Sequence, residues 1–336
     1  MPATDLSHFE EPISPDLSLV DPHHHFWGDG HPGAKAFGQF LPQDFTDDIA
    51  RSGHRFAATV YVDCGWAFRD KGPEHLRCVG ETDFVEATAK RFSPSEGPVG
   101  RIGAGIVGRA DLMLGDDVAS VLEAHLEASP ARFRGIRELL AYDPDIYQAL
   151  NIPQHKSRAP RFRAGMRQLE RSGLSLDVLC AHTMLTDIVD LARDFPGVPI
   201  ILNHLAGPIG VGRFRGMRVQ VFADWRAAIT ELAACPNVSI KLSGVGADLM
   251  GFGWNNGQTR PNSEILATAI QPYIMAAIDI FSPARCMFAS NFPVDGRSFS
   301  YGTLWNAFKH LAARYSADER DNLLRGTATR IYRLAV

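Results

Sequence analysis

The chain has 336 residues, which is enough for one large domain or two of ordinary size. Its 34 Lys and Arg against 38 Asp and Glu leave a formal net charge of -4. A nucleic-acid partner is disfavoured, because neutralising phosphates requires a clustered basic surface and no long stretch is rich in one sign. A hydrophobic share of 45% and a charged share of 21% are those of a globular protein.

Targeting signals are also missing from the expected places. The first residues, MPATDLSHFEEPISPDLS, lack the basic and apolar regions of a secretory signal. The most apolar long stretch, 265–281, is interrupted by Gln271, Pro272 and Asp279, so we expect no membrane span and no membrane partner. Five widely spaced cysteines favour reduced, buried thiols over disulfides or a Cys-x-x-Cys metal site. These features predict a cytoplasmic protein.

Short apolar runs alternate with longer amphipathic stretches, the pattern of repeated βα units around a parallel sheet. The predicted strands are 19–25, 57–63, 101–107, 135–140, 175–180, 199–204, 238–243 and 285–291. The predicted helices are 46–52, 81–92, 116–128, 159–172, 185–195, 221–234 and 264–281, and a capping box of Ser316 and Glu319 opens a last one.

Eight such units with no Pro/Gly/Ser-rich linker predict a single domain, a (β/α)8 TIM barrel over residues 18–336 with an N-terminal extension, residues 1–17. In such a barrel the reactive groups lie at the carboxyl ends of the strands. Two long Gly-rich connections, 204–218 and 244–261, follow predicted strands and are candidates for substrate-binding loops. The sequence is compatible with a homo-oligomer and does not determine the oligomeric state.

Histidines occupy several of the predicted strand ends. The first run ends in VDPHHHFW, and because strand side chains alternate, His23 and His25 are predicted to face one side of the sheet and His24 the other. A His-x-His pair facing the barrel interior puts two imidazoles within reach of one metal ion or one substrate oxygen. His182 follows the fifth run and His204 ends the sixth. For each of these two, a hydrogen-bonded structural histidine is the alternative.

Three further polar residues stand at or near strand ends. Arg137 would reach the end of the fourth run, where a guanidinium either binds a substrate carboxylate or forms a salt bridge with a helix. Lys241 stands between apolar neighbours, where an unpaired ammonium is costly, so it should face a carboxylate, a ligand or solvent. The eighth run ends with Asn291 at a position where the histidines invite a carboxylate, and Asp295 is a nearby substitute.

These residues together resemble the amidohydrolase-related family of the amidohydrolase superfamily. The resemblance is strongest to its branch of TIM-barrel lactonases, which includes 2-pyrone-4,6-dicarboxylate lactonase and L-fuconolactonase. It spans nearly the whole chain. The segments that carry it are VDPHHHFW, GIREL, ILNHLAGPIG, NVSIKLSG, FGWNNG, RCMFASNFPVD and TATRIYRL.

The resemblance implies hydrolysis of an ester-like bond, often in a lactone, by water activated at the strand ends. In lactonases of this branch the residue matching Asn291 is an aspartate that acts as the base, and some members work without a metal. In related decarboxylases the positions matching His23, His25 and His182 join that aspartate around zinc, and the one matching His204 assists proton transfer. One divalent ion, Zn²⁺, is therefore implied here, held less tightly because asparagine removes a negative charge.

The main hypothesis is a hydrolase that opens a small, carboxylated lactone or a related ester. His23 and His25 would polarise the substrate carbonyl, directly or through a metal, and His204 would accept or donate a proton. Asn291 would hold the attacking water.

The substrate itself is expected to be a small anionic molecule. Arg137 and Lys241 would anchor its carboxylate, and Trp27 and Trp254 would form apolar walls. Two alternatives remain: a zinc-dependent decarboxylase on the same barrel, and a non-catalytic protein that binds a small molecule.

Overall fold

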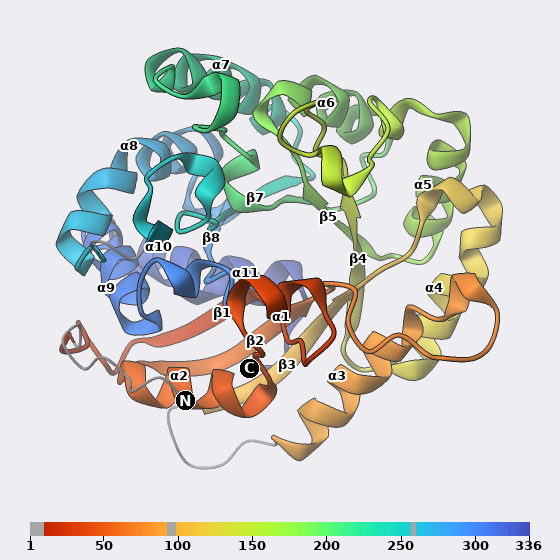
Figure 1. Cartoon of the computed structure of the whole chain (residues 1–336), viewed down its shortest axis with the longest axis horizontal. Helices are drawn as coiled ribbons and strands as arrows, with labels where there is room; N and C mark the ends of the chain where they lie inside the picture. The colour runs from red at the N-terminus through yellow and green to blue at the C-terminus, as the bar shows by residue number, and fades with distance from the viewer. Residues whose placement is uncertain (1–9, 93–98, 257–259) are drawn as a thin grey trace.

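The computed structural model describes residues 10–92, 99–256 and 260–336. Eight parallel strands form one sheet in chain order, and helices surround them (Figure 1). A bridge between His24 and Phe292 brings the chain after the last strand beside the first strand, so that the sheet curves into a barrel. The strands are β1 (Ser18–His24), β2 (Arg55–Val62), β3 (Val99–Gly108), β4 (Phe133–Leu139), β5 (Ser175–Leu179), β6 (Ile200–Leu202), β7 (Val238–Leu242) and β8 (Cys286–Phe288).

The predicted TIM barrel is confirmed, and each predicted strand is present with its ends moved by no more than three residues. These runs are easy to recognise because strands of a parallel barrel are buried on both faces and read as continuous apolar stretches. The helices are α1 (Pro32–Phe37), α2 (Pro42–Ser52), α3 (Val79–Arg91), α4 (Val118–Ala128), α5 (Pro160–Arg171), α6 (Leu185–Asp194), α7 (Arg218–Ala233), α8 (Ser263–Phe281), α9 (Tyr301–Ala312), α10 (Ala317–Asp321) and α11 (Thr327–Ile331).

Helix α9 is the one long helix that the sequence pattern did not predict. Its N-cap is Ser300, whose hydroxyl accepts a hydrogen bond from the backbone N–H of Thr303. Most of its residues are buried, including polar Asn306 and Lys309, so it lacks the polar face that marks an amphipathic helix. Residues 10–17 dock onto this helix: Lys309 donates to the carbonyls of Ile13 and Ser14. The predicted extension is thus packed from residue 10, and residues 1–9 lie outside the described residues.

The barrel interior is filled by side chains. A cluster of buried residues separate from the main core joins alternate strand positions to the C-terminal segment: Val20, Ala58, Val60, Val62, Val107, Ile201, Met287, Ala328, Tyr332 and Leu334. Tyr332 is fully buried, and its hydroxyl donates to the carboxylate of Asp177 on β5. Because these side chains fill the barrel, polar chemistry is left to the residues at the carboxyl ends of the strands.

Helix α8 is long and apolar enough, by length and composition, to cross a membrane. In the fold it packs against α7 and α9 and against β7 and β8, and 44% of its most apolar window is buried inside the protein. It therefore occupies the place of a barrel helix. The five cysteines are free thiols, as predicted.

Candidate functional site

The His-x-His pair of β1 faces the barrel as predicted. The Nε2 atoms of His23 and His25 lie 3.2 Å apart, whereas His24 points the other way, stacks on Phe45 and contacts Thr59. Burial lowers the pKa of His23 and of His25 well below the usual value, and the nearby cations Lys241 and Arg137 respectively add to the effect. Both imidazoles are therefore neutral at physiological pH.

The hydrogen bonds around this pair fix the tautomer of each ring. Lys241 Nζ lies 3.3 Å from His23 Nδ1, and an ammonium only donates, so Nδ1 accepts and the ring proton of His23 is on Nε2. His25 Nδ1 lies 2.7 Å from the carbonyl of Val62, which only accepts, so the proton of His25 is on Nδ1. The His23 Nε2–H then donates to His25 Nε2. The result is one directed chain from Lys241 through both imidazoles.

His204 joins this cluster from the residues that follow β6. Its ring centroid lies 4.6 Å from that of His23, and its Nδ1 lies 3.0 Å from the hydroxyl of Ser243. Although His204 keeps some exposure, enclosure by its neighbours lowers its pKa to about 3, with the charges of Arg137 and Lys241 adding to the shift. The predicted convergence of His23, His25 and His204 is thus present.

The backbone that carries His204 has an uncommon conformation. The φ angles of His204, Leu205 and Ala206 are 52°, 55° and 57°, and that of Gly207 is 66°, so four successive residues form a left-handed turn. Left-handed backbone costs roughly 1–2 kcal/mol for each residue other than glycine. Such a turn persists only where the surrounding structure holds it. Asn291, at the end of β8, is also left-handed, with a φ of 57°.

Asn291 and Asp295 form a hydrogen-bonded pair beside β1. The Asn291 Nδ2 donates to Asp295 Oδ1 at 2.8 Å, and the backbone N–H of Gly246 donates to the other carboxylate oxygen at 3.0 Å. Burial raises the pKa of Asp295 to about 7, against these hydrogen bonds. The buried Asn291 Oδ1 has no partner among the described residues, so it is an acceptor available to a water molecule.

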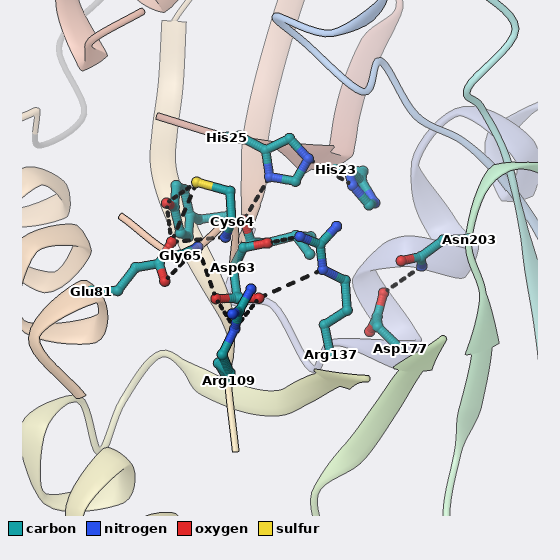
Figure 2. A network of polar contacts seen from close by, with 12 residues as sticks. His23, His25, Asp63, Cys64, Gly65, Glu81, Arg109, Arg137, Asp177 and Asn203 are labelled. Carbon is teal, nitrogen blue, oxygen red and sulfur yellow. Dashed lines mark hydrogen bonds and ion pairs between the residues drawn. The ribbon is translucent and has the colours of Figure 1, made fainter. Parts of the chain in front are cut away.

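Arg137 places a positive charge beside the imidazoles. Its guanidinium donates to the backbone carbonyl of Asp63, and its Nε lies 3.7 Å from the Asp63 carboxylate (Figure 2). Arg109 approaches the same carboxylate at 3.0 Å. Although burial opposes it, the two cations Arg109 and Arg137 lower the pKa of Asp63. Glu81 lies against Asp63, and burial together with that charge raises the pKa of Glu81 well above its usual value.

Lys241 is paired with a carboxylate that sequence reasoning did not identify. Its Nζ lies 2.6 Å from Asp177 Oδ1, and both side chains are fully buried. Asp177 also accepts from Tyr332 and from Asn203 Nδ2, which Figure 2 shows beside it. The first of the three expectations for Lys241, a facing carboxylate, is therefore correct. The sequence signal that could have revealed this pair is one charged residue within each of two otherwise apolar strands, Asp177 in β5 and Lys241 in β7.

The remaining predicted site residues differ in whether they contact the histidine cluster. Trp27 is buried and stacks on His25, with ring centroids 6.1 Å apart, which suits an apolar wall. His182 packs edge-on against Phe214, and its buried Nδ1 lacks a partner within the described part of the chain. Trp254 stacks on Phe252 in the loop after β7, and no described contact joins it to the histidines.

The donor set was tested for the zinc ion that the resemblance implies. Nowhere in residues 10–92, 99–256 and 260–336 do three or more His, Cys, Asp or Glu side chains gather as metal ligands, so His182 does not complete a set with His23 and His25. The proton on His23 Nε2 occupies the position that a metal would need, and the Lys241 ammonium opposes the alternative tautomer. Asn291 contributes no charge. This arrangement of donors does not fit a divalent ion.

Sequence reasoning missed the residues that support the cluster. Asp63 and Ser243 directly follow β2 and β7, and Asp177 lies inside β5, but single polar residues at such places carry no motif. Glu81 lies on α3 and reaches the cluster only through the fold. Only Asp63 and Ser243 carry a positional signal, since each directly follows a strand.

A parallel eight-stranded barrel with imidazoles and cations at the carboxyl ends of its strands defines a class of barrel enzymes. The family model described as Amidohydrolase matches residues 99–334, so the chain belongs to the amidohydrolase family and is a hydrolase.

Several known proteins are similar over nearly the whole chain. An uncharacterised protein, y4mH, of Sinorhizobium fredii is 35% identical over 95% of this chain and 99% of its own. An L-fucono-1,5-lactonase of Burkholderia ambifaria is 28% identical over 94% of this chain and 95% of its own. The crystal structure of an amidohydrolase from Burkholderia multivorans with bound zinc is 26% identical, covers 95% of this chain and 100% of that one, and superposes with a TM-score of 0.71.

Proposed function

We propose that this hydrolase opens a small lactone, or cleaves a related ester, with an activated water molecule. The observation that carries the proposal is the cluster of neutral imidazoles from β1 and the β6 end, which lies beside the buried Lys241 and the largely buried Arg137. The similarity to L-fucono-1,5-lactonases supports an intramolecular ester as the substrate.

The carbonyl group of the substrate would be polarised by the chain that starts at Lys241. The ammonium donates to His23 Nδ1 and so makes the Nε2–H of His23 a stronger donor. A lactone carbonyl oxygen seated above the pair would receive this N–H in place of His25 Nε2. As the carbonyl oxygen gains negative charge during attack, the fixed charges of Lys241 and Arg137 stabilise it.

The water would be held between Asn291 and His204. Asn291 Oδ1 accepts one hydrogen bond from it, and Asp295 keeps the amide in this orientation by accepting from Nδ2. His204, neutral and bonded through Nδ1 to Ser243, offers Nε2 as the base. The water oxygen bonds to the carbonyl carbon while its proton moves to His204. The ring C–O bond then breaks, and the same proton passes to the departing alkoxide, giving a hydroxy acid.

The substrate is proposed to carry a carboxylate that Arg137 binds. The Arg137 Nη2 donates to the Asp63 carbonyl and the Nε faces the Asp63 carboxylate, whereas the Nη1 has no hydrogen-bond partner within the described chain. Burial is the main cause of the low pKa of His204, and the charges of Arg137 and Lys241 add to it. A bound anion would offset the cationic contribution and so would make His204 a stronger base once the site is filled.

The test is a panel of sugar lactones and carboxylated lactones, with ring opening followed as acid release. We expect the His204→Gln variant to lose at least about a hundredfold in kcat, as for removal of an acid-base group. Arg137→Gln should raise KM for carboxylated lactones far more than for neutral ones. Arg109→Gln is the matched control, because Arg109 contacts the same Asp63 carboxylate from outside the histidine cluster.

The outcome also separates the alternatives. An unchanged rate in the His204→Gln variant would refute the proposal. Carbon dioxide release from aromatic acids with stoichiometric zinc would favour the decarboxylase. Thermal stabilisation by a ligand without turnover would favour the binding protein.

A further inference from the structure

The left-handed turn that carries His204 is held by one side chain from a surrounding helix. Trp225 lies on α7, is fully buried, and donates its indole N–H to the carbonyl of Leu205 at 2.6 Å. The Leu205 carbonyl belongs to the peptide between Leu205 and Ala206, so this hydrogen bond acts one peptide beyond His204. In the described part of the chain, Trp225 is the only side chain that donates to a carbonyl of residues 204–207.

The turn also has two backbone hydrogen bonds of its own, and one of them acts on the same peptide. Gly207 donates back to the His204 carbonyl, and Ala206 donates to Asn203. Gly244 lies so close that a Cβ there would stand 2.6 Å from the His204 Cβ. The Leu205–Ala206 peptide is thus held through its N–H by the Asn203 carbonyl and through its C=O by Trp225, which ties the turn to α7.

The conformation of the turn holds the His204 carbonyl through Gly207, and with it the backbone from which the imidazole extends. Ordinary right-handed or extended backbone is favoured at Leu205, as at any residue with a side chain. A change to either conformation at Leu205 would break the Gly207 hydrogen bond to the His204 carbonyl. The His204–Leu205 peptide could then rotate and carry the imidazole away from Ser243 and His23. The hydrogen bond from α7 therefore opposes a change that the local backbone favours.

We infer that Trp225 is a positioning residue, whose indole N–H holds the left-handed turn and thereby aims His204 at Ser243 and His23. The role rests on the proposed function of His204 as the base. Trp225 touches no reacting atom and acts only through Leu205. Its loss should therefore lower kcat and leave KM nearly unchanged, because the substrate contacts at Arg137 are retained.

The experiment compares two buried tryptophans. In Trp225→Phe the N–H is removed, and kcat should fall at least tenfold. Trp305→Phe on α9 is the matched control: Trp305 is equally buried, but its Nε1 has no hydrogen-bond partner in the described structure. It should lose stability of the same order and keep kcat. Replacing Trp225 with β-(3-benzothienyl)alanine, which exchanges N–H for sulfur at nearly constant volume, should reproduce the fall in kcat without the cavity.

A second readout does not depend on turnover. The ¹⁵N chemical shift of His204 Nδ1 reports its hydrogen bond to Ser243, and it should change in both Trp225 variants but not in Trp305→Phe. If kcat and this chemical shift are retained in the benzothienyl variant, the positioning role is wrong, even where His204→Gln shows that the proposed base is correct. If the chemical shift changes but no lactone is ever hydrolysed, the positioning role stands and the proposed function fails.

Discussion

The buried ion pair of Lys241 and Asp177 allows a quantitative test of the site's electrostatics. The two charged atoms are 2.6 Å apart, and neither side chain is exposed. Burial lowers the pKa of Lys241, and the Asp177 carboxylate opposes the shift. The variant Lys241→Met keeps the length of the side chain and removes the charge.

The structure sets the expected magnitude. Removing one partner of a buried pair leaves an uncompensated charge and typically costs about 3–5 kcal/mol. Asp177 keeps the hydroxyl of Tyr332 and the amide of Asn203, so we expect Lys241→Met to lose about 3 kcal/mol, the lower end of that range. Asp177→Asn should cost a similar amount, because it leaves the ammonium without a counterion. The double variant has no buried charge left over, so its loss should be smaller than the sum by about 2 kcal/mol or more.

Urea unfolding of the wild type, both single variants and the double variant at pH 7 gives the four free energies. Single losses that simply add would refute the reasoning, because additivity means the two charges do not interact. Lys241→Met should also slow lactone hydrolysis, since His23 Nδ1 loses its donor. A variant with full activity would show that the Lys241 to His23 hydrogen bond has no part in the reaction.

Three further outcomes are expected. The ionised Asp295 carboxylate holds the orientation of Asn291, and its pKa is about 7, so kcat/KM should fall as the pH drops below that value. In Asp295→Asn this pH dependence should disappear. If the variant keeps the pH dependence, another group is responsible for it. Burial lowers the pKa of His24 from 6.5 to about 3, so between these values the unfolded chain binds a proton that the folded protein does not, and stability falls as the pH falls. In His24→Phe, the slope of the unfolding free energy against pH between pH 6 and 4 should decrease by up to about 1.4 kcal/mol per pH unit. A slope equal to that of the wild type would contradict this cause. Protein that has been washed with a chelator should keep its hydrolytic activity, once elemental analysis has shown that it holds no stoichiometric zinc. If activity returns only on addition of zinc, the imidazole protons rearrange around a metal.

The structure also explains which parts of the site were predictable. His23, His25 and Arg137 could be predicted because a parallel barrel brings the carboxyl ends of all its strands to one end of the barrel. A polar residue at the end of a predicted strand is therefore enough to indicate a site residue. Asp177 and Asp63 were not predicted, because a single acidic residue in or directly after an apolar strand can have many structural roles. Asp177 on β5 and Lys241 on β7 pair because both strands are neighbours of β6 in the sheet, and no local sequence pattern contains that arrangement.

The eight strands, their order and the alternation that separates His24 from its two neighbours followed from the sequence alone, because strand periodicity and burial on both faces leave a direct trace in residue type. Helix α9 left no such trace, since burial on nearly every side removes the polar face by which a helix is recognised. Tertiary structure alone decided the tautomers of His23 and His25, the left-handed turn at His204 and the contact between Asn291 and Asp295. Each depends on hydrogen bonds from distant segments, even the contact of Asn291 with Asp295 four residues on, because His23 holds the Asn291 backbone and Gly246 holds the Asp295 carboxylate. Such bonds are set by packing.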